Sequence, residues 1–425
     1  MNYNLNGAGH PPDTVGDVGP NHFVQAVNTS IGIYSKTGTA LATFTFDGLW
    51  SGAGTGTPCD TDHGGDPTVI YVPQYDRFVV ADFSWADIQN GPYYECVAVS
   101  KTSDPKMGIW PDGLYMTTNM FDCLDSVCGN ANFKEARVYA LNIDDLVNGA
   151  TLRSVVADTN SSRYSLLPSN YRGTPPPAGR ENLVVAESGN LYAWEVYKFH
   201  VDYAVPSNST FTGPINVSQT QYVGAADPVA SSGNNIDTLS DRAMMQNQYR
   251  NIGGVESLWV NHTVGTTSAS TPTGIQWAQI DVTGGNITTT PVQEQIYNNG
   301  ADGLNRFMGS LAVDHVGNMA VGYTAESVSV APDIRYAGRL STDPLNALPQ
   351  TEVTMLPLLI QQMTALSGTR TCTTLRPVST GSLASAHSNS RHARPVRLQL
   401  HLRHRRRAQR RHPHPLQRRR LQVQR

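Results

Sequence analysis

The chain is poor in charge, and the charge that it has is segregated. Asp, Glu, Lys and Arg make up only 15 % of its 425 residues, well under the usual quarter. No Asp or Glu follows Glu352, although that last segment contains 15 Arg and 6 His. Positions 1–352 therefore carry 16 basic against 34 acidic residues, a net charge of −18. This acidic body argues against nucleic acid or an anionic membrane as its partner, and its abundance of Gly, Thr, Ser and Asn favours an extracellular β protein.

Long apolar segments are missing as well. No run of 18 apolar residues is present, so no transmembrane helix is predicted. The first ten residues have neither the basic start nor the apolar core of a signal peptide. For a secreted or cell-surface protein, we expect the leader peptide to lie upstream of this sequence.

Several catalytic signatures are also absent. The sequence contains no H-E-x-x-H, G-x-S-x-G, P-loop or dinucleotide fingerprint. The Gly-rich stretch at 51–57 precedes neither a helix nor a βαβ unit, so phosphate binding there is improbable. The histidines are scattered without metal-ligand spacing, and no cofactor is predicted with certainty.

What the sequence does contain is a recurring hairpin pattern. Its clearest example is the stretch 308–327, where two short apolar strands flank the turn residues Asp314, Gly317 and Asn318. Strand clusters begin near residues 22, 68, 110, 181, 243 and 308, without helical periodicity between them. Units of this size predict an all-β fold, a β-propeller of about six or seven blades over residues 1–352. A large β-sandwich is the alternative, whereas a β-helix would need a shorter and stricter repeat.

The segment 353–425 differs from this body. It has no acidic residue and no Phe, Tyr or Trp, and it is rich in Arg and His. One interpretation is a disordered basic arm that binds polyanions. The other is a slipped reading frame in a GC-rich gene, because misread GC-rich codons yield Arg, His, Pro, Leu and Gln.

Four of the five cysteines lie in the first third of the chain. The short spacing between Cys123 and Cys128 predicts a local disulfide, which would leave Cys59 to pair with Cys96. Four buried free thiols are the alternative.

The segment CDTDHGGDP is the candidate metal site. It places Asp60, Asp62 and Asp66 in a sharply turning, oxygen-rich loop of the kind that suits Ca²⁺, although it lacks the spacing and final Glu of an EF-hand. The alternative is an ordinary polar loop. Asp13 and Asp17 form a weaker version of the same pattern.

Arginines in the second half of the body are the candidate catalytic group. A sialidase-like site needs several Arg around a substrate carboxylate and a Tyr/Glu nucleophile pair. The candidates are Arg242, Arg250, Arg306, Arg335 and Arg339, with Glu256, Tyr249 and Tyr336 nearby in sequence. Local ion pairs such as Asp241 with Arg242 and Asp333 with Arg335 are the alternative. The aromatic residues Trp110, Trp194, Trp259, Trp277, Tyr93 and Tyr94 are expected either to stack on sugars or to fill the core between blades.

Several segments together resemble a family of large, uncharacterised bacterial secreted or surface proteins of β-propeller type, akin to sialidase-like propellers. They include PPDTVGDVGPNHFVQAVN, GDPTVIYVPQYDRFVVADF, KMGIWPDGLYMTTNMF, LSDRAMMQNQYRNIGGVESLWVNHTV and RFMGSLAVDHVGNMAVGYTAES. The resemblance covers most of residues 10–345. The chain departs from it by lacking a Tyr/Phe-rich strand between Pro105 and Lys106, and the family's closing aromatic strands after Glu352.

The resemblance implies a non-catalytic binding or structural module that displays loops to a glycan or an extracellular protein. Such a module would be a monomer or part of a larger multidomain chain. A sialidase-like glycoside hydrolase is the alternative function, and fold alone does not decide between them.

Overall fold

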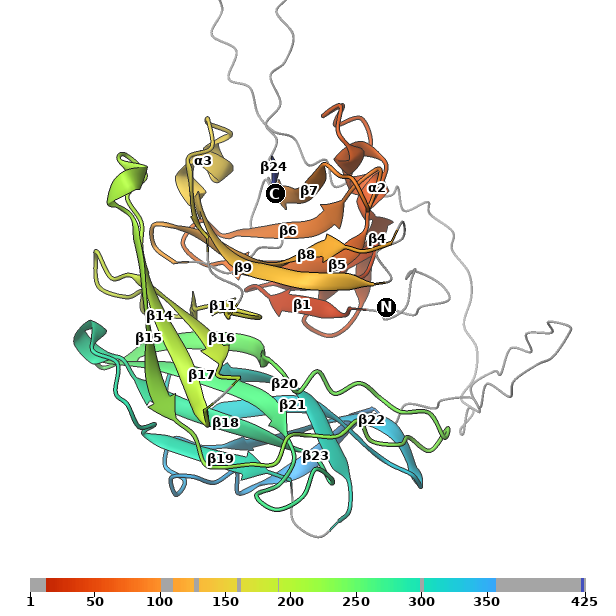
Figure 1. Ribbon diagram of the computed structural model, residues 1–425, viewed down its shortest axis with the longest axis vertical. Helices are drawn as coiled ribbons and strands as arrows, with labels where there is room; N and C mark the ends of the chain where they lie inside the picture. Colours follow the sequence, from red (N-terminus) through yellow and green to blue (C-terminus); the bar gives the residue numbers. More distant parts are fainter. Residues whose placement is uncertain are drawn as a thin grey trace, which may run out of the picture.

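The computed structural model describes residues 13–100, 110–125, 130–158, 162–189, 191–298, 302–356 and 422–423. Within these ranges almost all regular structure is β-strand, as Figure 1 shows, with two short helices, α2 (Phe46–Trp50) and α3 (Ile143–Asn148). Three 3₁₀ turns complete the elements, η1 (Pro58–Asp60), η2 (Pro206–Asn208) and η3 (Thr283–Gly285). No helix in this part of the chain is long and apolar enough to cross a membrane.

The first three sheets are formed by the N-terminal part of the chain (red to yellow in Figure 1). Sheet 1 consists of β1 (Val15–Val18), β2 (His22–Val27), β3 (Ser30–Ser35) and β4 (Ala40–Thr45). Sheet 2 consists of β5 (Gly65–Val72), β6 (Arg77–Ser84) and β7 (Tyr93–Val99), with β24 (Gln422–Val423) beside β7. Sheet 3 consists of β8 (Gly113–Cys123), β9 (Ala131–Asn142) and β10 (Ser154–Asp158).

The last three sheets follow in the same way (green to blue in Figure 1). Sheet 4 consists of β11 (Leu167–Pro168), β13 (Asn182–Glu187), β14 (Ala193–His200) and β15 (Thr210–Ser218). Sheet 5 consists of β12 (Asn170–Tyr171), β16 (Ala243–Ile252), β17 (Val255–Val264), β18 (Gly274–Asp281) and β19 (Gln293–Tyr297). Sheet 6 consists of β20 (Asn305–Val313), β21 (Met319–Ser327), β22 (Val330–Arg339) and β23 (Gln350–Leu356).

Six sheets, built from antiparallel pairs except for the short parallel pair of β12 with β16, make the six-bladed β-propeller arrangement that the hairpin pattern predicts. Each sheet packs against the next: β5 lies against β1 and β2, β8 against β11, β13 against β16, and β20 against β16 and β17. Sheets 2 and 3 share one hydrophobic cluster. The prediction of a β-propeller with about six or seven blades is therefore confirmed.

The hairpin at 308–327 illustrates why the chain folds in this way. Side chains along β20 alternate between buried and exposed from Phe307 onward, as expected for a strand with one face on the core. Asp314 accepts hydrogen bonds from the backbone N–H groups of Val316 and Asn318, and Gly317 has φ of 90°. The turn is thus fixed by a short carboxylate and by a residue that tolerates positive φ.

The last strand of sheet 6 extends beyond the predicted domain boundary. β23 continues to Leu356, past residue 352, and completes a four-stranded sheet. Apart from this strand and residues 422–423, the predicted basic tail of residues 353–425 lies outside the described residues.

Large aromatic side chains fill the spaces between sheets. Trp110, Trp194, Trp259 and Trp277 are each at most 2 % exposed. Each aromatic side chain of this size removes a large apolar area from water, at about 25 cal/mol per Å². The four tryptophans are therefore core residues, the second of their two expected roles.

One short segment belongs to two sheets. β11 pairs with β13 of sheet 4, and β12, which begins two residues after it, pairs in parallel with β16 of sheet 5. Asn247, which is fully buried, donates hydrogen bonds to the carbonyls of Leu167 and Leu183. Residues 167–171 therefore join sheets 4 and 5 by main-chain pairing.

Candidate functional site

Residues from sheets 1, 2 and 5 meet around Arg172, which directly follows β12. Its guanidinium forms an ion pair with Asp17 of β1 and donates a 2.6 Å hydrogen bond to the carbonyl of Tyr71 of β5. The same guanidinium lies 5.5 Å from the centre of the Tyr71 ring. Asp17 also accepts a 2.6 Å hydrogen bond from the backbone N–H of Tyr71. Residues of different blades therefore meet at this arginine.

Arg250 of β16 lies next to Arg172 and has no carboxylate of its own. It is 5 % exposed, and its Nη1 donates a 2.7 Å hydrogen bond to the carbonyl of Arg172. Its Nε has no hydrogen-bond partner, and no carboxylate in the described part of the chain forms an ion pair with it. Burial lowers the pKa of Arg250; the charge of Asp314 opposes that shift and the charge of Arg172 adds to it.

Gly173 lets the backbone approach this second guanidinium. It has φ of 74°, and a Cβ atom at this position would lie 3.3 Å from Nη1 of Arg250. A side chain would therefore be strained by the backbone conformation and crowded by the arginine. We call Arg172, Gly173 and Arg250, with Asp17 and Tyr71, the axial arginine site.

A second polar group lies on the other face of β16. Tyr249 donates a 2.7 Å hydrogen bond to Oε2 of Glu256, and Arg180 holds the same carboxylate through hydrogen bonds of 2.8 and 3.0 Å. Burial raises the pKa of Glu256, but the hydrogen bonds from Arg180 and Tyr249 outweigh it and leave the pKa lowered. The ring of Trp110 packs 5.0 Å from that of Tyr249.

These two polar groups do not share a binding point. Consecutive residues of a strand point to opposite faces of the sheet. Tyr249 with Glu256 therefore lies on one face of β16, and Arg250 lies on the other. The structure brings together a Tyr/Glu pair of the kind that a sialidase-like mechanism needs, but separates it from Arg250.

Three of the remaining candidate arginines have carboxylate partners of their own. Arg306 and Arg335 both hold Glu352, at 2.8 Å each, and each also pairs with a second carboxylate, Asp302 or Asp333. Arg242 pairs with Asp241 and donates a hydrogen bond to Tyr164. Arg339 resembles Arg250: it is 3 % exposed, it donates to the carbonyls of Asp343 and Pro344, and its Nε has no hydrogen-bond partner in the described part of the chain. A catalytic role for this group stays a prediction.

Sequence reasoning found Arg250 but missed Arg172 and Arg180. Arg172 lies 155 residues from Asp17 and 101 residues from Tyr71. No local pattern connects residues so distant in the chain. The one available signal is Arg-Gly at 172–173, which by itself is too common to identify a site.

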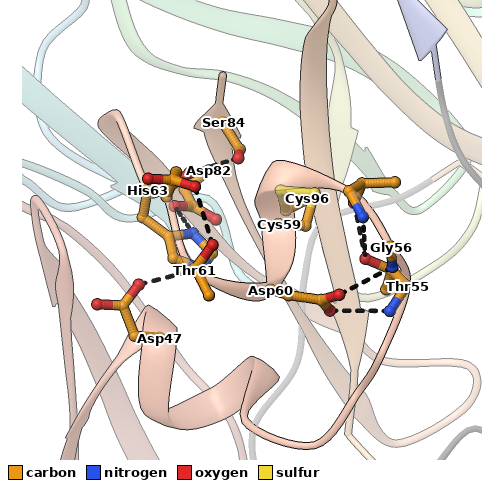
Figure 2. Close-up of a disulfide and its surroundings, with 12 residues drawn as sticks. Asp47, Thr55, Gly56, Cys59, Asp60, Thr61, His63, Asp82, Ser84 and Cys96 are labelled. Atoms are coloured by element: carbon orange, nitrogen blue, oxygen red, sulfur yellow. Dashed lines mark hydrogen bonds and ion pairs between the residues drawn. A yellow bond between two sulfur atoms is a disulfide. The ribbon is translucent and has the colours of Figure 1, made fainter. Parts of the chain in front are cut away.

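The three carboxylates of the predicted Ca²⁺ loop have different surroundings. Asp60, in η1, accepts hydrogen bonds of 2.9 Å from the backbone N–H groups of Thr55 and Gly56, as Figure 2 shows. Asp62 accepts one of 2.8 Å from Thr61. Asp66 lies beside Asp13, whose pKa is raised by burial and then by the Asp66 charge. Ca²⁺ binding by Asp60, Asp62 and Asp66 stays a prediction.

The predicted disulfide between Cys59 and Cys96 is confirmed, and it ties the same loop to β7. Cys123 is also disulfide-bonded. Its predicted partner, Cys128, lies outside the described residues. Within sheet 2, His63 and Asp82 lie beside the first disulfide (Figure 2).

Comparisons with known proteins give only distant likenesses. No family model matches the chain, and no curated protein matches it. An α-L-arabinanase of Cellvibrio cellulosa, solved with arabinohexaose, is 11 % identical, with 79 % of this chain and 94 % of that chain covered and a TM-score of 0.33. An α-L-arabinofuranosidase of Lactobacillus brevis is 10 % identical, with 80 % and 89 % covered and a TM-score of 0.28. A protein of unknown function from Dyadobacter fermentans is 11 % identical, with 66 % of each chain covered and a TM-score of 0.22. Similarity at this level carries no conclusion about activity.

Proposed function

We propose that this chain is a secreted or cell-surface binding module, without catalytic activity, that holds an acidic glycan at its axial arginine site. The observation that carries the proposal is Arg250, a 5 % exposed side chain that has no carboxylate partner in the described part of the chain and that lies beside a second arginine, Arg172. A buried charge is costly unless it is paired. A carboxylate or sulfate group of a ligand would supply the missing partner, and guanidinium groups are suited to bind both oxygens of such a group.

The surroundings of Arg250 fit this role. Arg172 adds a second guanidinium, while Asp17 neutralises only one of the two positive charges. Gly173 removes the side chain that would otherwise crowd Nη1 of Arg250. Secretion or surface display, as a monomer or within a larger multidomain chain, is supported by the extracellular composition and by the disulfide.

The decisive experiment is calorimetric titration of the full chain with oligogalacturonate, an acidic glycan, and with neutral arabinan oligomers. We expect binding of the acidic glycan and a loss of at least about tenfold in affinity in Arg250→Met, since a hydrogen bond to a charged group is worth about 1.5–3 kcal/mol. Arg242→Met is the matched control, because Arg242 already pairs with Asp241. Equal losses in both variants, or none in Arg250→Met, would contradict the proposal.

The Arg-rich segment of residues 353–425 is present in both variants, so their difference reports Arg250 alone. Salt provides a further separation. Binding through a basic segment weakens steeply with salt, because it releases counterions. Binding at a single buried arginine in a body of net charge −18 should weaken far less between 50 and 200 mM salt, concentrations at which polyanion binding changes by orders of magnitude. If no glycan binds, an extracellular protein becomes the candidate partner.

A sialidase-like glycoside hydrolase is the second candidate, and it rests on the 2.7 Å hydrogen bond from Tyr249 to Glu256. The test is release of a fluorescent aglycone from a sialoside by the full chain and by Tyr249→Phe. Turnover that is lost in Tyr249→Phe would favour the hydrolase. The absence of turnover in both proteins would leave the binding module.

A further inference from the structure

Four potential metal ligands meet where the loop that precedes β5 lies against β6 and β7 of sheet 2. They are separate from the axial arginine site. One ligand atom each of His63, Asp82 and Cys96 lies within 4.8 Å of the others. Cys59 adds a fourth, because it is bonded to Cys96. Figure 2 shows the disulfide with His63 and Asp82 beside it.

The two non-sulfur groups, His63 and Asp82, are buried, and Asp82 carries a polar atom without a partner in the described part of the chain. Asp82 is fully buried, and its Oδ1 has no hydrogen-bond partner in the described part of the chain. The side chain of His63 is 1 % exposed, and its Nε2 forms no hydrogen bond there but lies 3.6 Å from the exposed carboxylate of Asp47. The only contact between them joins Nδ1 of His63 to Oδ2 of Asp82 at 2.6 Å. An unpartnered polar atom at this depth is costly, so Oδ1 of Asp82 points to a ligand.

The backbone holds the four residues in two pairs. Asp82 and Cys96 are direct partners on β6 and β7, so their side chains share one face of sheet 2. Cys59 and His63 lie four residues apart in the loop that precedes β5. The Cα atoms of Cys59 and Cys96 are 5.7 Å apart, a distance at which side-chain rotation can direct both sulfurs to one ion.

We propose that reduction of the Cys59–Cys96 disulfide opens a site for a thiophilic divalent cation, with Cys59, Cys96, His63 and Asp82 as its ligands. Two thiolates, an imidazole and a carboxylate are a donor set that Zn²⁺ takes in tetrahedral geometry. A dithiol reductant supplies two electrons and two protons, which cleave the S–S bond to two thiols while the dithiol becomes a disulfide. Binding of Zn²⁺ then displaces the two thiol protons into solvent.

The disulfide and the ion exclude each other. In an oxidising compartment the S–S bond ties the loop to β7, and in a reducing compartment the ion ties the same four residues together. The loop between sheets 1 and 2 is therefore held to β6 and β7 in both compartments. This proposal does not depend on the axial arginine site or on its ligand.

The experiment uses the full chain, reduced with a dithiol that is then removed, with and without Zn²⁺. Alkylation of each cysteine by N-ethylmaleimide is followed by peptide mass spectrometry. We expect Zn²⁺ to slow the alkylation of Cys59 and Cys96 by at least about tenfold, because bound thiolates are shielded. The same ion should leave Cys372 unchanged. Equal rates for Cys59 and Cys96 with and without Zn²⁺ would overturn the proposal.

Two variants separate this site from nonspecific thiol binding. Asp82→Asn should lose most of the protection. Asp241→Asn is the matched control, because the Asp241 carboxylate is exposed and pairs with Arg242 rather than with a proposed ligand. Full protection in Asp82→Asn would remove Asp82 from the site. If Asp82→Asn does not fold, the wild-type chain still decides the question: equal Zn²⁺ protection of Cys123, Cys128, Cys59 and Cys96 would overturn the proposal.

Discussion

Arg306 and Arg250 lie on strands that pack together, β20 and β16. Among the described residues, Arg306 forms ion pairs and Arg250 forms none. Arg306 is fully buried and holds Asp302 and Glu352, and these hydrogen bonds and charges raise its pKa in spite of burial. Arg250 is nearly as buried, has no carboxylate partner, and has a lowered pKa. The first arginine is matched within the chain and is structural. The second has no ion pair in the described part of the chain, and under the proposed function a ligand supplies the opposite charge.

We expect the largest effect from replacing Arg306, the arginine whose charge is paired within the chain. Arg306→Leu leaves Asp302 without an ion pair and leaves Glu352 with Arg335 and Tyr323. Removing one partner of a buried ion pair costs about 3–5 kcal/mol. We expect a loss of that size in the free energy of unfolding, measured by urea denaturation. A loss below about 1 kcal/mol would show that the network in sheet 6 contributes little.

Glu95 extends the comparison to a buried acid. The charges that act on it, those of Asp82 and Asp66, have the same sign as its own. It is 7 % exposed, and burial, then the charges of Asp82 and Asp66, raises its pKa to about 8 from 4.5. The folded state therefore binds this proton more tightly than the unfolded state, and stability falls as pH rises from about 4.5 to 8. Unlike a guanidinium, a carboxylate escapes burial of its charge by taking up a proton.

Glu95→Gln should remove this pH dependence. Each tenfold change in an ionisation constant corresponds to about 1.4 kcal/mol, so we expect the variant to gain on the order of 3–4 kcal/mol relative to wild type at pH 8, and little at pH 5. Asp82, whose pKa burial raises to about 6, contributes in the same direction between about pH 4 and 6 in both proteins. Parallel stability curves for the two proteins from pH 5 to 8 would contradict the assignment.

A smaller effect is expected from replacing Arg250, the arginine without an ion pair in the described part of the chain. Arg250→Leu removes an unpaired buried charge, together with its hydrogen bond to the carbonyl of Arg172. Since the desolvation cost disappears with the charge, the free energy of unfolding should change by no more than about 1 kcal/mol in either direction. Urea denaturation without ligand is the measurement. A loss as large as that of Arg306→Leu would mean that Arg250 is structural and that the comparison fails.

The smallest effect is expected at Arg242, which pairs with Asp241 at a site where the two side chains are 29 % and 55 % exposed. Exposed ion pairs contribute about 0–1 kcal/mol. Arg242→Ala should therefore change thermal stability by less than about 0.5 kcal/mol. A larger loss would indicate that its stacking on Tyr164 carries more of the packing than the ion pair does.

The fold was predictable because its signals are local. Asp314, Gly317 and Asn318 define a turn from within five positions, and similar turns recur along the chain. The Tyr249–Glu256 contact was also within reach, because the two residues lie seven positions apart across one hairpin.

The sites were less predictable because they join distant segments. The spacing of Asp60, Asp62 and Asp66 suggested a shared ion, but Asp60 is bonded by the backbone of its own loop. The group around Cys96 depends on Asp82, which β6 places opposite it. That relation follows from strand register, and register is set by the whole sheet rather than by local spacing.

The segment of residues 167–171 has a mechanical consequence. Its first half is hydrogen-bonded into sheet 4 and its second half into sheet 5, so neither sheet can open at this point without pulling on the other. Blades joined only by side-chain packing can separate one at a time, whereas these two share a main-chain connection. In amide hydrogen exchange they should open as one cooperative unit, with nearly the same protection.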